Sequence, residues 1–416
     1  MDVRLYDHVV LCLDVPEDNL KSGDVAVLVD LIPHPSNGEM GAILEVFNAL
    51  GESISVVTVP ISAIKPLQAN EIFTVRSLSL QSQLSMNLLK DSKKIRFVDL
   101  FCGLGGFRLA IEQVCRQKNL ESDCVFSCDI DKDARSIYQA NFGDQPRGDI
   151  TEIAALDIPN HDILMAGFPC QPFSICGNLK GFEDTRGTLF FEIARILKAK
   201  QPAAFILENV KQLQGHQQGK TLQVILDTLQ DLDYYTDYRV LNALHFGLPQ
   251  KRERIFIVGF REARDFIWPK PALSRTSLTE ILEENVSDFY YASEKIQKSR
   301  LLKREGKKPY SEPTIWHENK GGNVSAYPYS CALRAGASYN YLLVDGKRRL
   351  TEREMLRLQG FPDDYQIVGS YQTMRKLTGN SVAISCVAAV VNSVIESWLD
   401  VEQASTNSFS LNRQLN

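Results

Sequence analysis

Short hydrophobic runs separated by polar turns mark the first 75 residues of the chain. Residues 25–31, 42–47 and 53–59 form three β-type runs, and residues 5–13 alternate more weakly. The second and third runs flank residues 48–52, which have the composition of a hairpin connection. Several short strands joined by tight turns predict a small all-β barrel at this end of the chain.

The pattern changes near residue 95, where hydrophobic strands begin to alternate with helical stretches. A strand at 95–100 precedes a glycine turn at 103–106, and the next apolar positions fall on one helical face. Further strands are predicted at 124–128, 203–207 and 255–260. This succession is typical of a Rossmann-like α/β domain. The glycine turn departs from the GxGxxG spacing, which disfavours a nicotinamide cofactor.

Other stretches do not follow the α/β rhythm. Residues 76–94, rich in Ser, Leu, Gln and Lys, are expected to form a linker that is partly helical. After residue 260 the rhythm stops and resumes only at 349, which indicates an insertion. The last helix is predicted at 384–398, and the Ser-, Asn- and Gln-rich tail from 399 is expected to be disordered.

The charge is distributed unevenly along the chain. The net charge is −5, but the first 75 residues hold 11 acidic and three basic residues, a balance of −8. The remaining 40 acidic and 43 basic residues give positions 76–416 a balance of +3. An acidic barrel repels phosphates, so we expect a protein contact or a folding appendage there, and a passive appendage is an equal alternative.

The cysteine content and the hydropathy indicate the compartment. Nine cysteines without a CxxC pair, and six scattered histidines, support neither a disulfide framework nor a zinc site. The N-terminus lacks a basic leader, and no apolar stretch approaches the roughly 18 residues that a membrane span needs. We therefore expect a soluble cytoplasmic protein without a metal.

Cys170 is the strongest candidate for a nucleophile. It follows Pro169 at the end of a hydrophobic strand that begins near residue 162. The carboxyl end of a strand in an open α/β sheet faces the ligand crevice. A buried structural thiol is the commoner interpretation of any single cysteine, so other motifs have to decide.

Four further sequence blocks favour a catalytic role for Cys170. They are Phe-Val-Asp-Leu-Phe-Cys-Gly-Leu-Gly-Gly-Phe at 97–107, Glu-Asn-Val at 208–210, Gln-Lys-Arg-Glu-Arg at 250–254 and Gly-Asn-Ser-Val at 379–382. With the Pro-Cys turn, these blocks resemble those of the DNA (cytosine-5) methyltransferase family. The resemblance implies an α/β, Rossmann-like S-adenosylmethionine-dependent methyltransferase with a small target-recognition domain. Residues 5–66 resemble a small SH3-like bacterial domain of unknown function, an all-β barrel that precedes the enzyme.

The resemblance implies a division of the chain and a biological role. The segments are a small acidic β-barrel domain at 1–75, a linker at 76–94, a methyltransferase catalytic domain at 95–262, a target-recognition domain at 263–345, a return segment completing the catalytic domain at 346–398 and a disordered tail at 399–416. The implied role is 5-methylcytosine formation in a short duplex DNA sequence, as the protective half of a bacterial restriction-modification pair. Double-stranded DNA is the implied partner of a monomeric protein, and a cognate restriction endonuclease would act separately.

The family chemistry assigns four catalytic residues. Carbon 5 of cytosine is a poor nucleophile. The Cys170 thiolate therefore adds to carbon 6, and this addition activates carbon 5. Glu208 holds or donates a proton at ring N3, for which burial would raise its pKa. Arg254 grips the base carbonyl and orients Glu208, and Arg252 supports the Cys170 loop or a phosphate. The target base has to leave the duplex, and residues 171–186 have the composition of a loop that closes over it.

The resemblance also assigns the S-adenosylmethionine site. Asp129, where the family more often has Glu, is the implied ribose ligand, and Ile130 would pack on the adenine. Asp149 would accept from the adenine amino group, and Asn380 would lie near the methionine end. The full set is Phe101, Gly103, Gly105, Gly106, Asp129, Ile130, Asp149, Ile150, Pro169 and Asn380.

The insertion is expected to read the DNA sequence. Its basic run would contact phosphates and comprises Lys295, Lys298, Arg300, Lys303, Arg304, Lys307 and Lys308. Residues 316–341 combine aromatic side chains with polar and basic ones. The substrate-binding candidates are Ser174, Gln250, Arg334 and Asn340.

Three other functions are considered. A cytidine deaminase needs an HxE element and a second Cys three residues after the first, but position 173 is Phe. A transfer-RNA cytosine-5 methyltransferase shares most blocks and differs only through the insertion between 261 and 347. A catalytically silent DNA-binding regulator should lack the Pro-Cys or Glu-Asn-Val residues, and this chain has both.

Overall fold

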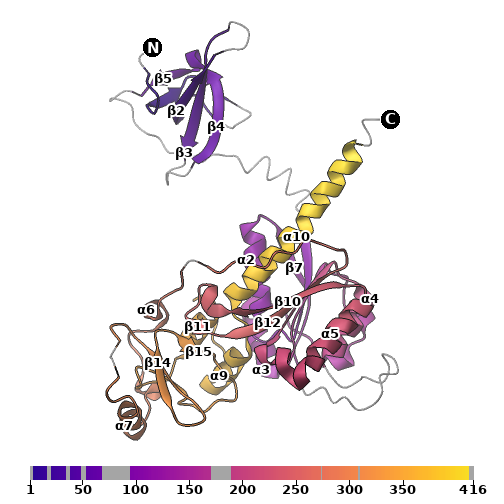
Figure 1. Ribbon diagram of the computed structural model, residues 1–416, viewed down its shortest axis with the longest axis vertical. Coiled ribbons are helices and arrows are strands. Elements are labelled where there is room, and N and C mark those ends of the chain that lie inside the picture. The colour runs from indigo at the N-terminus through magenta and orange to yellow at the C-terminus, as the bar shows by residue number, and fades with distance from the viewer. Residues whose placement is uncertain are drawn as a thin grey trace. The chain divides into compact units, whose positions relative to one another are not determined.

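The computed structural model describes residues 3–15, 20–33, 38–47, 53–67, 94–169, 189–272, 274–307 and 310–411 (Figure 1). The chain divides into two compact units, Met1–Ser92 and Lys93–Asn416. Each unit is considered by itself. All but the last residue of the expected linker at 76–94 lies outside the described residues.

The N-terminal unit is an antiparallel five-stranded sheet with the strand order β4-β3-β2-β1-β5. Its strands are β1 (His8–Leu11), β2 (Val25–Ile32), β3 (Gly41–Phe47), β4 (Ser53–Pro60) and β5 (Ile64–Pro66), with the 3-10 turn η2 (Ile61–Ala63) before the last. Alternate residues of the strands, such as Ala42 and Leu44 of β3, form one buried core. The all-β class is therefore confirmed.

The second unit contains a six-stranded mixed sheet with the order β10-β12-β9-β8-β6-β7. The strands are β6 (Lys94–Leu100), β7 (Glu121–Cys128), β8 (Ile163–Gly167), β9 (Ala204–Val210), β10 (Tyr235–Asn242) and β12 (Glu253–Phe260). Strands β7, β6, β8 and β9 are parallel to one another, whereas β12 runs antiparallel to both β9 and β10. The carboxyl ends of the four parallel strands thus meet at one edge of the sheet.

Helices cover both faces of this sheet, which confirms the α/β fold (Figure 1). They are α2 (Gly106–Gln117), α3 (Lys132–Phe142), α4 (Leu189–Lys200), α5 (Lys220–Asp231) and α10 (Ile384–Leu411). Ile95 and Phe97 of β6 share a core with α2, α3 and α10. Val98 and Leu100 share a second core with α4 and α5. The sheet is therefore a middle layer between two helical layers.

The return segment contributes α8 (Glu352–Gln359), α9 (Tyr371–Asn380) and α10. Contrary to the expectation from the sequence, an 18-residue window within Tyr371–Trp398 is long and apolar enough to cross a membrane. Of this window 72% is buried, and α10 packs against α2, as a core helix does. The helix continues to Leu411, whereas the sequence predicts that it ends at 398 and that a disordered tail follows from 399, so this prediction is wrong for residues 399–411. Residues 399–411 contain neither Gly nor Pro, so nothing in their composition stops a helix that packing has begun.

The insertion after β12 forms a small separate layer. It contains α6 (Leu278–Ile281), the 3-10 turn η7 (Asp288–Tyr290), α7 (Glu294–Leu302) and the antiparallel sheet β14-β13-β16, formed by Val324–Tyr327, Ile315–Glu318 and Leu342–Val344. The short strand β15 (Ser330–Cys331) pairs in parallel with β11 (Gln250–Lys251). A core of its own joins the insertion to α8. This arrangement fits the interruption of the α/β pattern that the sequence shows.

Candidate active site

A cavity of about 770 Å³ lies at the carboxyl ends of β6, β7, β8 and β9. Its size is in the range of small-molecule sites. The predicted site residues that line it are Phe101, Gly103, Gly106, Asp129, Ile130, Asp149, Ile150, Pro169, Glu208, Arg252, Arg254, Arg334 and Asn380. Residues from every described sequence block therefore meet in one space.

The glycine turn between β6 and α2 is tightly packed. Gly105 has a φ of +76°, and a Cβ there would overlap the ring of Phe142. A Cβ on Gly106 would lie 2.7 Å from a methyl group of Val382. The Tyr365 hydroxyl donates to the Leu104 carbonyl at 2.8 Å, so the return segment also fixes the turn. Gly105 supports the turn without lining the cavity itself.

Asp129 and Ile130 follow β7 at the cavity wall. The Asp129 carboxylate accepts the backbone N–H groups of Gly103 and Asp131, both at 2.8 Å, and burial raises its pKa. Each oxygen keeps a second lone pair for a hydroxyl donor. Ile130 is 70% exposed, which leaves an apolar face free beside this carboxylate. The pair fits a ribose diol and an adenine ring, as the resemblance implied.

Asp149 and Ile150 extend this wall. Asp149 accepts the backbone N–H and the hydroxyl of Thr151 at 2.9 and 2.8 Å, which fixes its orientation. Ile150 is buried and lines the cavity. A carboxylate next to an apolar side chain can receive an amino group at the edge of a flat ring, so these residues also fit adenosine.

Glu208 lies in β9, between Gly167 of β8 and Phe256 of β12. It is buried, and its Oε1 lies 2.9 Å from the Nε of Arg254. This is an ion pair without hydrogen-bond geometry, because Oε1 has no hydrogen-bond partner among the described residues. Burial raises the pKa of Glu208, and the charges of Arg254 and Arg252 oppose the rise. A protonatable carboxyl with free bonding capacity thus faces the cavity.

Cys170, Ser174 and the expected closing loop at 171–186 lie outside the described residues. Pro169, the residue before Cys170, lines the cavity. The Asn209 Nδ2–H donates to the Phe168 carbonyl at 2.9 Å and fixes the chain two residues before the thiol. Asn209 is a functional residue to which the sequence alone assigned no role, although a polar residue within a hydrophobic strand is a recognisable signal.

Two candidates of the Gln-Lys-Arg-Glu-Arg block have other partners than expected. Arg252 lines the cavity but is buried, and its guanidinium donates to the carbonyls of Leu333, Gly379 and Ser381. These bonds make the guanidinium a support for backbone of the insertion and of the return segment, and its buried Nε has no hydrogen-bond partner among the described residues. The Cys170 loop, which Arg252 was also expected to support, lies outside the described residues. Gln250 is fully buried and does not line the cavity, contrary to its assignment as a substrate ligand.

Part of the basic run forms ion pairs within the insertion. Arg300 is buried and pairs with Glu318 at 2.6 Å, and Lys303 pairs with the same carboxylate at 2.7 Å. Lys308 lies outside the described residues. Arg334 is exposed and lines the cavity, whereas Asn340 does not line it. Arg334 is therefore the described substrate candidate that lies at the cavity.

Metal-binding side chains do not cluster in the described ranges. Within them, no group of three or more His, Cys, Asp or Glu residues is placed to hold a metal ion. The chemistry of the cavity is better matched to an organic group with a ribose and an adenine. Its donors are carboxylates, glycine backbone and apolar side chains.

Comparison with known proteins identifies the family. The profile of the family described as C-5 cytosine-specific DNA methylase matches residues 95–396. The chain is 56% identical over 295 residues to the type II methyltransferase M.NgoBI of Neisseria gonorrhoeae, covering 70% of this chain and 90% of that protein. It is 53% identical over 308 residues to M.HaeII of Haemophilus aegyptius, covering 73% and 94%.

A solved structure shows the same fold. The crystal structure of DNMT2 from Spodoptera frugiperda matches with a TM-score of 0.57 at 20% identity, over 72% of this chain and 99% of that one. The family match begins at residue 95 and does not include the N-terminal unit. From the profile match and these identities, the chain belongs to the C-5 cytosine-specific DNA methylase family and is a DNA (cytosine-5-)-methyltransferase.

Proposed function

We propose that the protein methylates carbon 5 of a cytosine that has been flipped out of a short specific duplex DNA sequence into this cavity. One observation carries the proposal. The Glu208–Arg254 pair and Pro169 line the same cavity as the four residues that fit adenosine. S-adenosylmethionine supplies an electrophilic methyl group when bound. Asp129, Ile130, Asp149 and Ile150 would hold its adenosine, and Asn380 its methionine end.

Cys170 acts as the nucleophile in this proposal. Its thiolate forms a bond to carbon 6 of the cytosine, and the electron pair of the 5,6 double bond makes carbon 5 nucleophilic. Carbon 5 would then form a bond to the methyl group while the bond from that group to the sulfonium sulfur breaks, so that S-adenosylhomocysteine is the leaving group. Loss of the carbon 5 proton and elimination of the thiolate restore the ring. Asn209 holds Phe168 and thereby limits where the thiol can lie.

Glu208 controls the charge that this addition places on the ring. A protonated carboxyl donates to N3, so that the ring nitrogen can accept electron density as the carbon–sulfur bond forms. Arg254 is 2.9 Å from Glu208 and carries further donors that can bind the base carbonyl. Arg252 fixes the surrounding backbone and is a positioning residue.

The cytosine has to leave the duplex, because its carbon 6 is inaccessible to a thiol while the base is stacked. We assign the insertion at 263–345 as the target-recognition domain and residues 346–398 as the part that completes the catalytic domain. Arg334 would contact DNA beside the cavity. A closing loop at 171–186 would exclude water during the reaction.

We infer that the enzyme protects host DNA in a restriction-modification system, since two of its relatives are named type II methyltransferases. A cognate endonuclease would act separately, and the methyltransferase would work in the cytoplasm as a monomer without a metal. Bisulfite sequencing of DNA from an expressing host tests the proposal, with transfer RNA from the same cells as a second sample. Methylation of the RNA alone would overturn it.

Removal of residues 1–92 should leave the methylation rate and the methylated sequence unchanged. The second unit is compact by itself and contains the whole family match. The acidity of the N-terminal unit also opposes phosphate binding. Methylation by the full chain and by a protein starting at Lys93 would be compared at equal concentration. A large loss of rate in a shortened protein that remains folded would assign the N-terminal unit a part in catalysis.

Exchange of residues 316–341 for the corresponding segment of a relative with another target should change which sites are methylated. Cytosine should stay the methylated base, because Cys170, Glu208 and Arg254 lie outside this segment. Each good bidentate contact to a base edge contributes roughly 1–3 kcal/mol of discrimination. Whole-genome bisulfite maps of hosts carrying the parent and the chimera make the comparison. An active chimera with the parental sites would place recognition elsewhere.

A further inference from the structure

Residues 333–340, here called the rim segment, border the cavity without forming a helix or a strand. Leu333, Arg334, Ala335 and Gly336 line the cavity itself. Irregular backbone is inherently mobile unless side chains satisfy its polar groups. The partners of this backbone therefore decide whether Arg334 has a fixed position.

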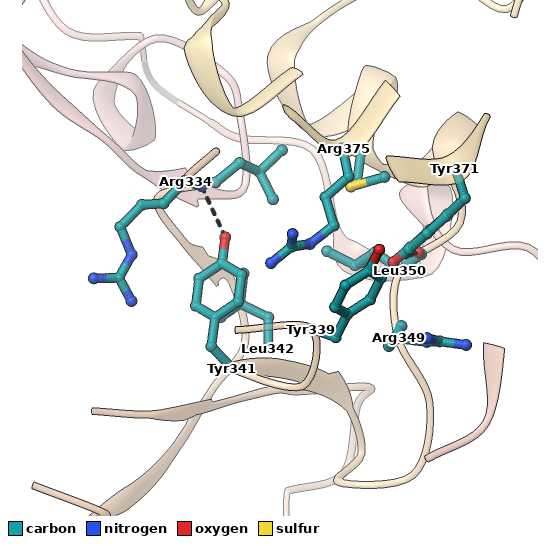
Figure 2. A pocket seen from close by; sticks show the side chains of 10 residues that line it. Arg334, Tyr339, Tyr341, Leu342, Arg349, Leu350, Tyr371 and Arg375 are labelled. Atoms are coloured by element: carbon teal, nitrogen blue, oxygen red, sulfur yellow. Dashed lines mark hydrogen bonds between the residues drawn. The ribbon is translucent and has the colours of Figure 1, made fainter. Parts of the chain in front are cut away.

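Side chains from outside the rim segment hold its first residues. The Leu333 N–H donates to the buried side chain of Gln250 at 3.0 Å, and the Leu333 carbonyl accepts from Arg252 at 3.0 Å. The Tyr341 hydroxyl accepts the backbone N–H of Arg334 at 2.8 Å (Figure 2). These bonds use only the backbone of the segment and none of the side-chain donors of Arg334, whose guanidinium lies over the Tyr341 ring.

Arg375 of α9 holds the middle of the rim segment. It is 8% exposed, and its Nη2 donates to the carbonyls of Ala337 and Ser338, the second at 2.8 Å. Its guanidinium lies 4.8 Å from the ring centre of Tyr339 and 5.8 Å from that of Tyr341. Figure 2 shows the guanidinium reaching between these two tyrosines. Arg375 thus combines hydrogen bonds with cation–π contacts on one segment.

The end of α9 brings the rim segment close to the cofactor side of the cavity. A Cβ on Gly379 would lie 2.7 Å from the backbone of Arg334 and overlap that of Ala335. Asn380, the next residue, lines the cavity. Helix α9 therefore carries both Arg375, which holds the rim segment, and Gly379, whose missing side chain lets the backbone of the rim segment lie close to the helix.

We propose that Arg375 is a positioning residue that holds the rim segment in the shape that presents Arg334 to DNA at the edge of the cavity. The inference rests on the proposed function, because it takes DNA to be the substrate. The hydrogen bonds from Arg375 go to the backbone of the segment, and its guanidinium also lies against the Tyr339 ring. The exposed Arg334 guanidinium, 4.9 Å from the Tyr341 ring, would then contact a phosphate near the flipped base.

Arg375→Gln tests the proposal in the full-length protein. We expect the KM for unmethylated plasmid DNA to rise on the order of tenfold to a hundredfold, with a smaller change in kcat, because the segment is no longer held in place. The affinity for S-adenosylhomocysteine should be unchanged. Arg375→Lys should give an intermediate KM, because lysine keeps the charge and the donors but lacks the planar stacking surface.

Trypsin cleavage after Arg334 provides a readout without substrate. We expect faster cleavage in Arg375→Gln than in the wild type, measured by mass spectrometry of the fragments. Arg264→Gln is the matched control, because Arg264 also donates to two backbone carbonyls, those of Ser397 and Trp398. These carbonyls lie about 20 Å along α10 from the start of the helix at Ile384. The control should change neither the KM nor the cleavage.

Unchanged KM and unchanged cleavage in a folded Arg375→Gln protein would overturn the proposal. A loss of affinity for S-adenosylhomocysteine as large as the rise in KM for DNA would also overturn it, because that result would indicate that the whole cavity is disrupted. A wild-type protein that methylates no plasmid DNA would instead overturn the proposed function. The cleavage comparison would still decide whether Arg375 holds the rim segment.

Discussion

Cys170→Ser should abolish methyl transfer to DNA and leave binding of duplex DNA and of S-adenosylhomocysteine intact. A serine hydroxyl remains protonated at neutral pH and is a far weaker nucleophile than a thiolate, so carbon 6 is not attacked. We expect the rate to fall by at least about 10³-fold, as when other covalent nucleophiles are removed. Tritium transfer from labelled S-adenosylmethionine to DNA measures the rate, and a gel shift measures binding.

The same exchange at an exposed thiol serves as the control. Cys12 is exposed in the N-terminal unit, so Cys12→Ser should keep the full rate. Turnover of Cys170→Ser at a rate near that of the wild type would contradict covalent catalysis by this thiol. It would also leave the Pro-Cys pair that follows β8 in the sequence without a catalytic explanation.

The cavity residues that the sequence located best lie at, or shortly after, the carboxyl ends of parallel strands. Asp129 follows β7, Pro169 follows β8, and Glu208 lies near the end of β9. The carboxyl ends of neighbouring parallel strands meet at one edge, so a correct strand assignment is enough to bring these residues together. The resemblance then supplied their individual roles.

The partners of Arg252 and Gln250 could not be read from their block. Arg252 bonds to Leu333, 81 residues away, and to Ser381, 129 residues away. Contacts at such separations depend on how the insertion and the return segment dock, and no local pattern encodes docking. The sequence predicts that Arg252 supports the Cys170 loop or a phosphate, whereas in the structure its guanidinium donates to backbone carbonyls of the insertion and the return segment.

The same limit applies to the basic run of the insertion. Lys and Arg at close spacing are typical of a solvated or DNA-binding face. Arg300 is instead buried against Glu318, because β13 brings that carboxylate beside α7. The length of α10 was also underestimated, since its continuation to Leu411 depends on a helix already begun in the core.

The strongest electrostatic expectation concerns the proton on Glu208. Burial raises its pKa, so the carboxyl stays protonated at a higher pH than an exposed glutamate does. The proton is present below this raised pKa and is lost as the pH rises through it. A step that needs the proton therefore slows with rising pH, whereas the thiolate fraction of Cys170 grows. Together these two groups predict a bell-shaped dependence of kcat/KM on pH.

Glu208→Gln should lower kcat by about 10²- to 10⁴-fold, the range that general acid–base catalysis contributes. Glutamine keeps an amide donor near N3 but cannot exchange a proton in this pH range. The alkaline decline that Glu208 causes should therefore disappear in the variant, while the acidic limb set by the Cys170 thiol remains. Initial rates measured across the pH range with saturating S-adenosylmethionine show both limbs.

Glu253→Gln is the matched control, because Glu253 lies in the same strand, β12, that carries Arg254. Its carboxylate pairs with Lys211 at 2.9 Å and does not line the cavity. This variant should keep both the rate and the bell-shaped pH dependence. A change in either would show that removing any negative charge near Arg254 affects the reaction. An alkaline limb that persists unchanged in Glu208→Gln would assign the decline to another group and remove Glu208 from the proton transfer at N3.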